Sequence, residues 1–247
     1  MTATLDIDQA ATELEHADAA DVLRWATANL PRFAVSSSFG ADSAVLLHLI
    51  AQVDANIPVL FLETGFHFPE TLRYRHDLAE LLGLRDVRDL KPELTVVQQA
   101  SEHGGGLYVR DSDGCCAIRK VEPLNRALRE FDGWASGVRR GQTSERAETP
   151  VVQTVNREGR DMVKVSPLAR WSTEDVDGYL AHHGLPRHPL AEVGYPSIGC
   201  APCTRAVLPG EDPRAGRWAG SAKTECGIHI ELPGEPVALE LRDRSGR

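Results

Sequence analysis

The stretch Phe33-Ala-Val-Ser-Ser-Ser-Phe-Gly-Ala-Asp-Ser43 decides the fold of this 247-residue chain. Its first residues are typical of a short buried strand, and the apolar run after Gly40 predicts a helix. A strand, a serine-rich turn and a helix in this order form the repeating unit of parallel sheets. In such a sheet the turn opens at the carboxyl end of the strand, which is where ligands bind.

The same unit recurs through the first half of the chain. Further buried strands are predicted at 58–62, 86–90 and 134–138. Helices are predicted within 5–30, 69–82 and 92–103, with Gly83 ending the second of these. We therefore expect the α/β class, with a parallel twisted sheet and helices on both of its faces.

The pattern changes after Thr149. Two apolar runs, at 150–155 and 161–165, predict a hairpin, and Ser172 with Asp175 predicts the capped start of a helix. Prolines and glycines then crowd a loop-rich segment. The expected division is an N-terminal helical segment 1–30, a main domain 31–229 that contains the loop-rich segment 186–220, and a C-terminal tail 230–247.

Composition narrows the class of protein. The net charge of −9 argues against an extended nucleic-acid surface. The first residues do not resemble a signal peptide, and no stretch approaches the ~20 apolar residues of a membrane helix. We expect a cytoplasmic protein that binds neither nucleic acid nor membrane. The oligomeric state stays open, and a homo-oligomer is compatible with the sequence.

Five cysteines carry the strongest chemical signal: the adjacent pair Cys115-Cys116, the spaced pair Cys200-x-x-Cys203, and the separate Cys226. In a chain of this size and expected compartment, cysteine clusters are more often metal-binding or catalytic than disulfide-bonded. Zinc suits the spaced pair, but adjacent side chains diverge too strongly to meet easily at one ion. A cubane iron–sulfur cluster is wide enough for both to reach different iron atoms. We favour one 4Fe-4S cluster held by the two pairs; zinc and buried unliganded thiols remain as alternatives.

The turn after the first strand suits a phosphate or sulfate group. Serine hydroxyls, backbone amides and a helix N-terminus converge there, although the lysine of a Walker A loop is absent. The residues after the second predicted strand would line the same crevice. The residues expected to bind substrate in these two turns are Ser36, Ser37, Ser38, Phe39, Gly40, Ser43, Glu63, Thr64 and Gly65.

Further stretches accompany this turn: Leu62-Glu-Thr-Gly-Phe66, Cys115-Cys-x-x-Arg-Lys-x-x-Pro-Leu124, Gly137-Val-Arg-Arg-Gly-Gln142, Cys200-x-x-Cys203, Arg214-x-Gly-Arg-Trp218 and Glu225-Cys-Gly-Ile-His229. With them, the chain resembles the assimilatory adenylyl-sulfate reductases, within the phosphoadenylyl-sulfate reductase family and the PP-loop superfamily. The resemblance runs from about Phe33 to His229, and it implies an adenine nucleotide alpha hydrolase-like fold. One departure is Glu63, where the family commonly has aspartate.

The resemblance implies an oxidoreductase of sulfate assimilation and cysteine biosynthesis. It would reduce adenosine 5′-phosphosulfate to sulfite and AMP, with electrons from thioredoxin or a similar thiol donor. Cys226 would attack the sulfur and expel AMP, and a second thiolate would release sulfite by exchange at Cys226. Cations must surround so anionic a substrate. The candidates are Lys120, Arg139, Arg140, Arg214, Arg217, Lys223 and His229.

Two finer expectations concern the cluster and the tail. Lys120, one helical turn after Cys116, would transmit the charge of the cluster to the substrate, and the cluster would brace the segment around Cys200. The glycine- and proline-rich approach to Cys226 predicts a tail that closes over substrate and opens to the donor.

Rival functions come from the same superfamily and from other classes. A reductase of 3′-phosphoadenylyl sulfate is the nearest rival, but such relatives generally lack the four cluster cysteines. A PP-loop ATP pyrophosphatase or RNA-thiolating enzyme would need a basic RNA surface, which the net charge disfavours. A zinc-stabilised nucleotide-binding module would leave Cys226 without a role.

Overall fold

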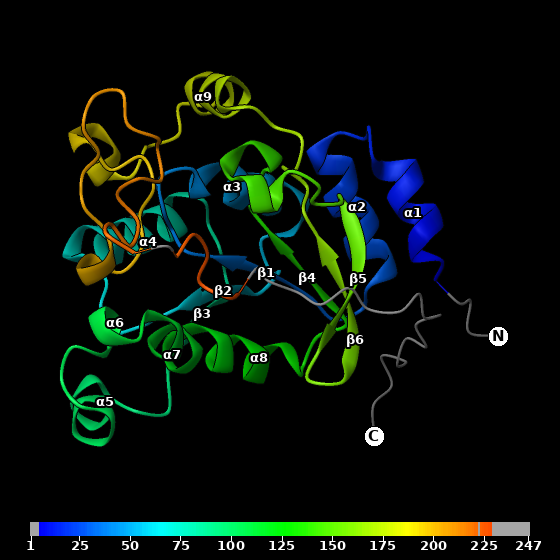
Figure 1. Cartoon of the computed structure of the whole chain (residues 1–247). Coiled ribbons are helices and arrows are strands. Elements are labelled where there is room, and N and C mark those ends of the chain that lie inside the picture. Colours follow the sequence, from blue (N-terminus) through cyan, green and yellow to red (C-terminus); the bar gives the residue numbers. More distant parts are fainter. Residues whose placement is uncertain (1–4, 222, 229–247) are drawn as a thin grey trace.

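The computed structural model describes residues 5–221 and 223–228 and is built around a six-stranded sheet (Figure 1). Across the sheet the strands follow the order β3-β2-β1-β4-β6-β5. Their bounds are β1 Phe33–Ser37, β2 Val59–Leu62, β3 Val87–Leu90, β4 Gly133–Ser136, β5 Val152–Arg157 and β6 Arg160–Val165. The strands predicted from the sequence are thus confirmed, with ends that differ by a few residues.

The sheet is parallel except at one edge. β3, β2, β1, β4 and β6 pair in parallel, whereas β5 is antiparallel to β6. The predicted hairpin supplies that edge, because Glu158 and Gly159 both have positive φ angles, 52° and 78°. Two left-handed residues form the turn whose twist matches that of the flanking strands. The predicted α/β class is therefore confirmed, with one antiparallel edge strand.

Helices cover both faces of the sheet (Figure 1). Their bounds are α1 Ile7–Leu14, α2 Ala19–Asn29, α3 Ser43–Asp54, α4 Pro69–Leu81, α5 Val96–His103, α6 Leu107–Arg110, α7 Ser112–Cys116, α8 Glu122–Leu128 and α9 Thr173–His182. The predicted helix within 5–30 is two helices, since the chain turns before Asp18. α5 begins later than predicted because Thr95 and Gln98 form a capping box. The predicted cap of Ser172 with Asp175 is confirmed.

Alternation along the strands assigns side chains to two cores. Val35 of β1 and Phe61 of β2 pack on the face covered by α2, α3 and α4. The intervening residues Ala34 and Leu60 pack on the opposite face, against Leu124 and its neighbours in α8. Successive side chains of a strand point to opposite faces, so a short apolar run fills both cores. In the described ranges, no helix is long and apolar enough to cross a membrane.

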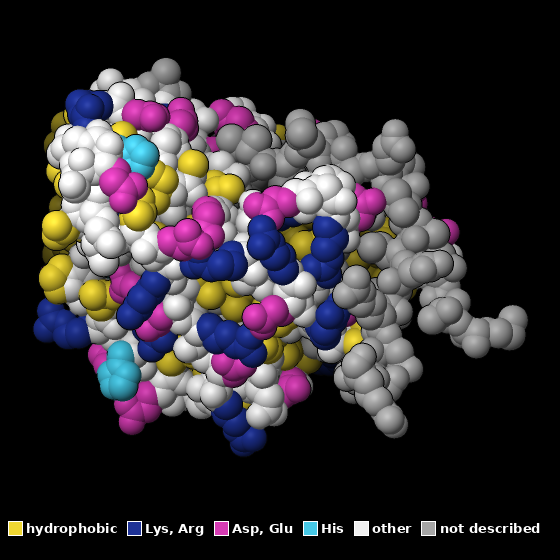
Figure 2. Space-filling model, turned by 90° about the horizontal axis from the view of Figure 1, so that it is seen from below, with side chains coloured by type: hydrophobic (Ala, Val, Ile, Leu, Met, Phe, Trp, Pro, Cys, Tyr) yellow, Lys and Arg dark blue, Asp and Glu magenta, His cyan; other side chains and the backbone are white. Residues whose placement is uncertain are grey.

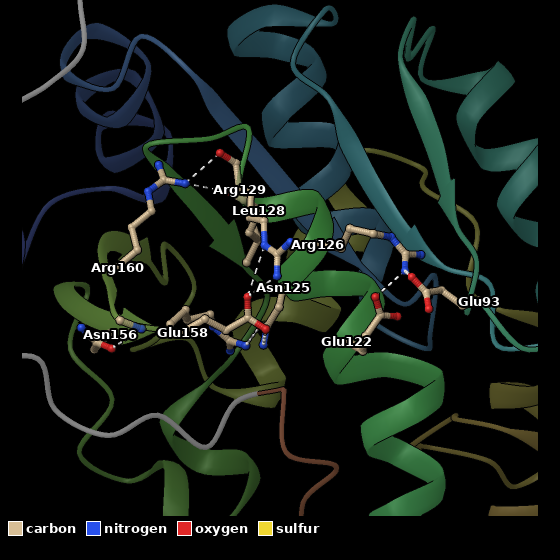
Figure 3. A network of polar contacts seen from close by, with 11 residues as sticks. Glu93, Glu122, Asn125, Arg126, Leu128, Arg129, Asn156, Glu158 and Arg160 are labelled. Carbon is tan, nitrogen blue, oxygen red and sulfur yellow. Dashed lines mark hydrogen bonds and ion pairs between the residues drawn. The ribbon is translucent and has the colours of Figure 1, made fainter.

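The outer side of α8 is tied to its neighbours by polar contacts (Figure 3). Arginines reach to acidic side chains or backbone carbonyls: Arg126 to Glu93 and Glu122, Arg129 to Glu158, and Arg160 to the carbonyl oxygens of Leu128 and Arg129. Exposed pairs of this kind each contribute little to stability, but the Arg129 and Arg160 contacts together hold the β5–β6 turn against the end of α8.

Candidate active site

A cavity of about 210 Å³ opens where β1, β2 and β4 end. β1 is the strand from which the chain moves in both directions across the sheet, with β2 on one side and β4 on the other. Such a switch point leaves a crevice at the carboxyl ends of parallel strands. Ser36, Leu62 and Ser136, all near strand ends, contribute to its wall.

The serine-rich turn after β1 is fixed by Phe39. This residue is fully buried, has a left-handed φ of 48°, and packs its ring edge-on against Phe61 at 5.5 Å. Its N–H donates to Ser37 Oγ at 3.1 Å. A Cβ at Gly40 would lie 3.2 Å from Ser38 Oγ, so the glycine allows a tight turn. Burial of Phe39 stabilises a conformation that non-glycine residues rarely adopt.

Most of the residues predicted to bind substrate in the two turns do line the cavity. These are Ser36, Ser37, Ser38, Gly40, Ser43 and Thr64. Three others shape the turns instead. Phe39 is in the core, Glu63 accepts the N–H of Gly65 at 2.8 Å, and Gly65 takes a left-handed φ of 75°.

The predicted cations divide in the same way. Lys120, Arg139, Arg214 and Arg217 line the cavity, and Arg139 also pairs with Asp42 at the start of α3. Arg140 points elsewhere, because Arg139 is extended and adjacent side chains diverge. Its Nη atoms donate to both oxygens of Glu15 at 2.7 and 3.0 Å, and this pairing lowers the pKa of Glu15.

Lys223 stands at the edge of the site rather than in the cavity. Its Nζ lies 2.7 Å from Asp113 Oδ1, donates to the carbonyl oxygen of Ser112 at 2.8 Å, and lies 5.3 Å from the ring centre of Trp218. His229, the remaining predicted cation, lies outside the described residues.

Cys226 is buried against Cys116 and Trp218 and lines the cavity. The residue before it, Glu225, accepts two hydrogen bonds from Arg146, from Nε at 2.6 Å and from Nη2 at 2.7 Å. Arg214 adds its charge 3.6 Å from the same carboxylate. The segment that contains Glu225 and Cys226 thus lines the cavity instead of lying on the surface.

Several cavity residues had no role in the sequence analysis: Asp42, His67, Gln142, Arg146, Trp218 and Glu225. Asp42, Gln142, Trp218 and Glu225 do stand within the quoted stretches, and this position was the available signal. Arg146 lies beyond any quoted stretch, and its partner is 79 residues away in the sequence.

The other four cysteines line one hollow beside the cavity, together with Arg119 and Lys120. Cys115 and Cys116 end α7, while Cys200 precedes and Cys203 ends a single helical turn at Ala201–Cys203. None of these thiols is in a disulfide. Within the described ranges, no three His, Cys, Asp or Glu side chains converge as a group that could hold one metal ion.

Local contacts hold the two cysteine pairs in place. Asp111 Oδ1 caps α7 by accepting the N–H of Gly114 at 2.8 Å, and a Cβ at Gly114 would lie 2.3 Å from Asp111 Oδ2. The N–H of Ala201 donates to the carbonyl oxygen of Phe66 at 2.7 Å, which ties the second pair to the turn after β2. The backbone N–H of Trp218 donates to the carbonyl oxygen of Cys203 at 2.9 Å.

A π-helical turn, Ala117–Val121, joins α7 to α8 and turns two cations inward. Arg119 donates from Nε to Gln99 Oε1 at 2.6 Å, and Lys120 lines both the hollow and the cavity. The π turn ends just before α8, which has Pro123 in its first turn. Proline is tolerated there because its missing N–H has no partner to lose.

Burial and charge oppose each other in this hollow. Burial, with the neighbouring Cys200, raises the pKa of Cys203 to about 11, and burial also raises the pKa of Cys115. Burial disfavours the charged form of Lys120, but electrostatic attraction to the sulfurs of Cys200, Cys226 and Cys116 outweighs this effect. The pKa of the lysine is therefore raised. A group of buried thiols therefore stays neutral unless cations balance it, and Arg119 and Lys120 provide two. Ligands of an iron–sulfur cluster bind different iron atoms, so four thiols that line one hollow without meeting at one point suit a cluster better than a single ion.

Comparison with known proteins gives consistent matches. Residues 32–206 match the family model described as the phosphoadenosine phosphosulfate reductase domain. An adenosine 5′-phosphosulfate reductase of Streptomyces coelicolor is 48% identical over 90% of this chain and 92% of its own length. A phosphoadenosine 5′-phosphosulfate reductase of Gloeobacter violaceus is 45% identical over 80% of this chain and 82% of its own.

Solved structures agree with the sequence matches. The phosphoadenylyl-sulfate reductase of Candida auris, in a phosphate complex, superposes with a TM-score of 0.69 and 26% identity, covering 81% of this chain and 96% of that one. An FMN adenylyltransferase of Candida glabrata, at 15% identity and a TM-score of 0.55, shares the fold alone. The family model spans well over half of the chain, and the identities to whole relatives exceed 40%. The chain therefore belongs to the phosphoadenosine phosphosulfate reductase family.

Proposed function

We propose that this protein reduces adenosine 5′-phosphosulfate to sulfite and AMP in sulfate assimilation, with thioredoxin or a similar dithiol as donor. Relatives of that name align along nearly the whole chain. The observation that carries the proposal is the position of Cys226. This thiol lines the same cavity as the serine-rich turn and three cations, Lys120, Arg214 and Arg217.

In the first step the thiolate of Cys226 attacks the sulfur of the sulfo group. An S–S bond forms, the bond from sulfur to the bridging phosphate oxygen breaks, and AMP leaves with the electron pair. Arg214 and Arg217 suit the phosphate and sulfo oxygens, because guanidinium groups match such oxyanions. Positive charge beside the attacking sulfur also offsets the repulsion between an anionic nucleophile and an anionic substrate.

In the second step a donor thiolate attacks Cys226 Sγ, and sulfite leaves with the electrons of the S–S bond. The second donor thiol then reduces the mixed disulfide, which restores Cys226 and leaves the donor oxidised. The two electrons of the reaction come from the dithiol. The residues of this chain bind, orient and stabilise charge.

We further propose that Cys115, Cys116, Cys200 and Cys203 hold one 4Fe-4S cluster. The support is a four-thiol donor set in one hollow, with Arg119 and Lys120 beside it. When bound, the cluster would supply negative charge near Lys120 and join the second cysteine pair to α7. Analysis for iron and sulfide, together with an absorption band at ~400 nm, tests this proposal. A zinc site would contain no sulfide and would show no such band.

The second candidate substrate is 3′-phosphoadenylyl sulfate, because a relative at 45% identity carries that name. The cluster cysteines favour the unphosphorylated nucleotide. An RNA-binding function has less support, since acidic and basic side chains are interspersed on the face shown in Figure 2 and the net charge is −9.

The test is a reaction without reductant. The purified protein is mixed with adenosine 5′-phosphosulfate, and mass spectrometry follows the mass of one SO₃ group on the peptide that contains Cys226. We expect stoichiometric modification that is absent from Cys226→Ser and slower with the 3′-phosphorylated nucleotide. Sulfite release by Cys226→Ser at the wild-type rate would overturn the proposal.

A further inference from the structure

Residues 223–228, here called the strap, are held at both ends and in the middle. Lys223 pairs with Asp113, and Arg157 donates to the carbonyl oxygen of Ile228. Between these ends, the Nη2 atom of Arg214 donates to the carbonyl oxygen of Thr224 at 2.9 Å. The reactive thiol at Cys226 thus belongs to a short segment without a helix or strand, and side chains of distant elements fix its place.

A further contact, the ion pair of Arg146 with Glu225, is the strongest one that the strap makes. The carboxylate is bound by two parallel N–H bonds, and the side chains are only 10% and 4% exposed. By contrast, Asp113, the acidic partner at the end of the strap, has an 88% exposed side chain. Exposed pairs contribute little to stability, whereas removing one partner of a buried bidentate pair is strongly destabilising.

Each of the three guanidinium nitrogens of Arg146 has a protein partner. Its Nε and Nη2 bind Glu225, and its Nη1 donates to Gln142 Oε1. Gln142 Oε1 in turn accepts the backbone N–H of Arg139 at 3.1 Å, which links the pair to the turn after β4. Arg217 differs, because its buried Nε has no hydrogen-bond partner among the described residues. Arg146 is thus committed to the strap, while Arg217 keeps a donor for a ligand.

We propose that Glu225, through its ion pair with Arg146, is a positioning residue that holds Cys226 in line with the substrate. The expected effect on catalysis rests on the proposed function. The anchoring of the strap by this ion pair does not depend on that function. Glu225 touches neither substrate nor the reacting sulfur in this role. It fixes the backbone from which Cys226 projects, and a displacement of ~1 Å can cost about 100-fold in rate.

The test compares Glu225→Gln with Glu211→Gln in the full-length protein. Glu211 is a matched control, since it also accepts two bonds from one arginine, Arg205, at 2.8 and 2.9 Å, but it does so on an exposed loop. Alkylation of Cys226 by iodoacetamide, followed by mass spectrometry, reports how often the strap opens, whatever the reaction catalysed. S-sulfonation by adenosine 5′-phosphosulfate and binding of AMP are measured on the same samples.

We expect Glu225→Gln to alkylate at least about tenfold faster and to be sulfonated about 100-fold more slowly. AMP affinity should stay within about twofold, since Arg146 is not offered to ligand. Glu225→Asp should partly reverse both the faster alkylation and the slower sulfonation. Arg146→Lys should resemble Glu225→Gln, and Glu211→Gln should match wild type.

Unchanged alkylation of Glu225→Gln would overturn the inference, as would faster alkylation with an unchanged rate of sulfonation. Tighter AMP binding without slower sulfonation would instead make Glu225 a competitor for the anion site and would also overturn it. If wild-type Cys226 is never sulfonated, the proposed function fails, while the alkylation comparison still decides whether the pair anchors the strap.

Discussion

Arg140 and Arg217 look alike in the sequence, yet the structure gives them opposite surroundings. Arg217 lines the cavity with a buried Nε that has no partner among the described residues, whereas Arg140 is bound to Glu15 and to the carbonyl oxygen of Thr149. Replacing Arg217 by Ala should lower kcat/KM for adenosine 5′-phosphosulfate about 100- to 1,000-fold, the usual effect of losing one charge-stabilising donor. Steady-state kinetics of sulfite release measures this.

Arg140→Ala is the matched control. It should keep kcat/KM within about threefold and lower the free energy of unfolding by about 1–2 kcal/mol, because it removes a half-buried ion pair and a backbone contact. If Arg140→Ala lost activity as Arg217→Ala does, the placement of Arg140 away from the cavity would be contradicted.

At this scale the sequence analysis succeeded where chemistry is local. The serines of the first turn reach the cavity because the strand before them and the helix after them place the turn there. It could not separate Arg139 from Arg140, since the divergence of adjacent side chains depends on a backbone conformation that the sequence does not specify. The pair of Arg146 with Glu225 was missed for a different reason. Only the folded chain brings those two residues together.

Among the elements, the π turn at Ala117–Val121 sets the direction of Arg119 and Lys120. Deleting Ala117, which is exposed, should convert it to an α-helical turn and rotate the residues on one side of it by about 100°. Since Leu124 and Leu128 anchor α8 in the core, the strain falls on the cysteine pair and Lys120. If the four cysteines hold the proposed cluster, we expect soluble protein with less than about half of the wild-type iron per chain, measured by metal analysis.

Ala117→Ser keeps the number of residues and should keep the iron content. Equal iron in the deletion variant and wild type would show that the turn is not needed for the cysteine pair to bind metal. The deletion has a second readout in the near-UV circular dichroism of Trp218, which packs on Cys116.

Most of the other elements were predictable from sequence. The central strands β1 and β2 carry apolar runs because both faces of the sheet are covered, and Gly83 ends α4 in a left-handed conformation, with φ 64°. A π turn cannot be read in this way. Its extra residue is stabilised by packing on both sides, here by Arg119 against Gln99 and by Leu124 in the core, and both contacts are made between distant segments.

For the whole molecule, His188 makes stability depend on pH. Its ring is fully buried between α4 and the loop-rich segment, where Nδ1 accepts the N–H of Leu190 at 3.1 Å. The proton must therefore be on Nε2, which donates to Thr71 Oγ1 at 3.0 Å. Burial lowers the pKa of His188 to about 4. A second proton would face the N–H of Leu190 in a fully buried site.

Between pH 6.5 and 4 the unfolded chain therefore binds a proton that the folded chain does not, and stability must fall as the pH falls through this window. We expect His188 to account for a loss of up to about 3 kcal/mol by pH 4, from about 1.4 kcal/mol for each pH unit. Urea unfolding at several pH values measures this loss.

His188→Asn keeps an acceptor for Leu190 and should flatten this part of the curve of stability against pH, although it lowers stability at pH 7. Replacing the 74% exposed His76 by Gln should leave the slope unchanged. A slope in His188→Asn as steep as in wild type would assign the acid sensitivity to other groups.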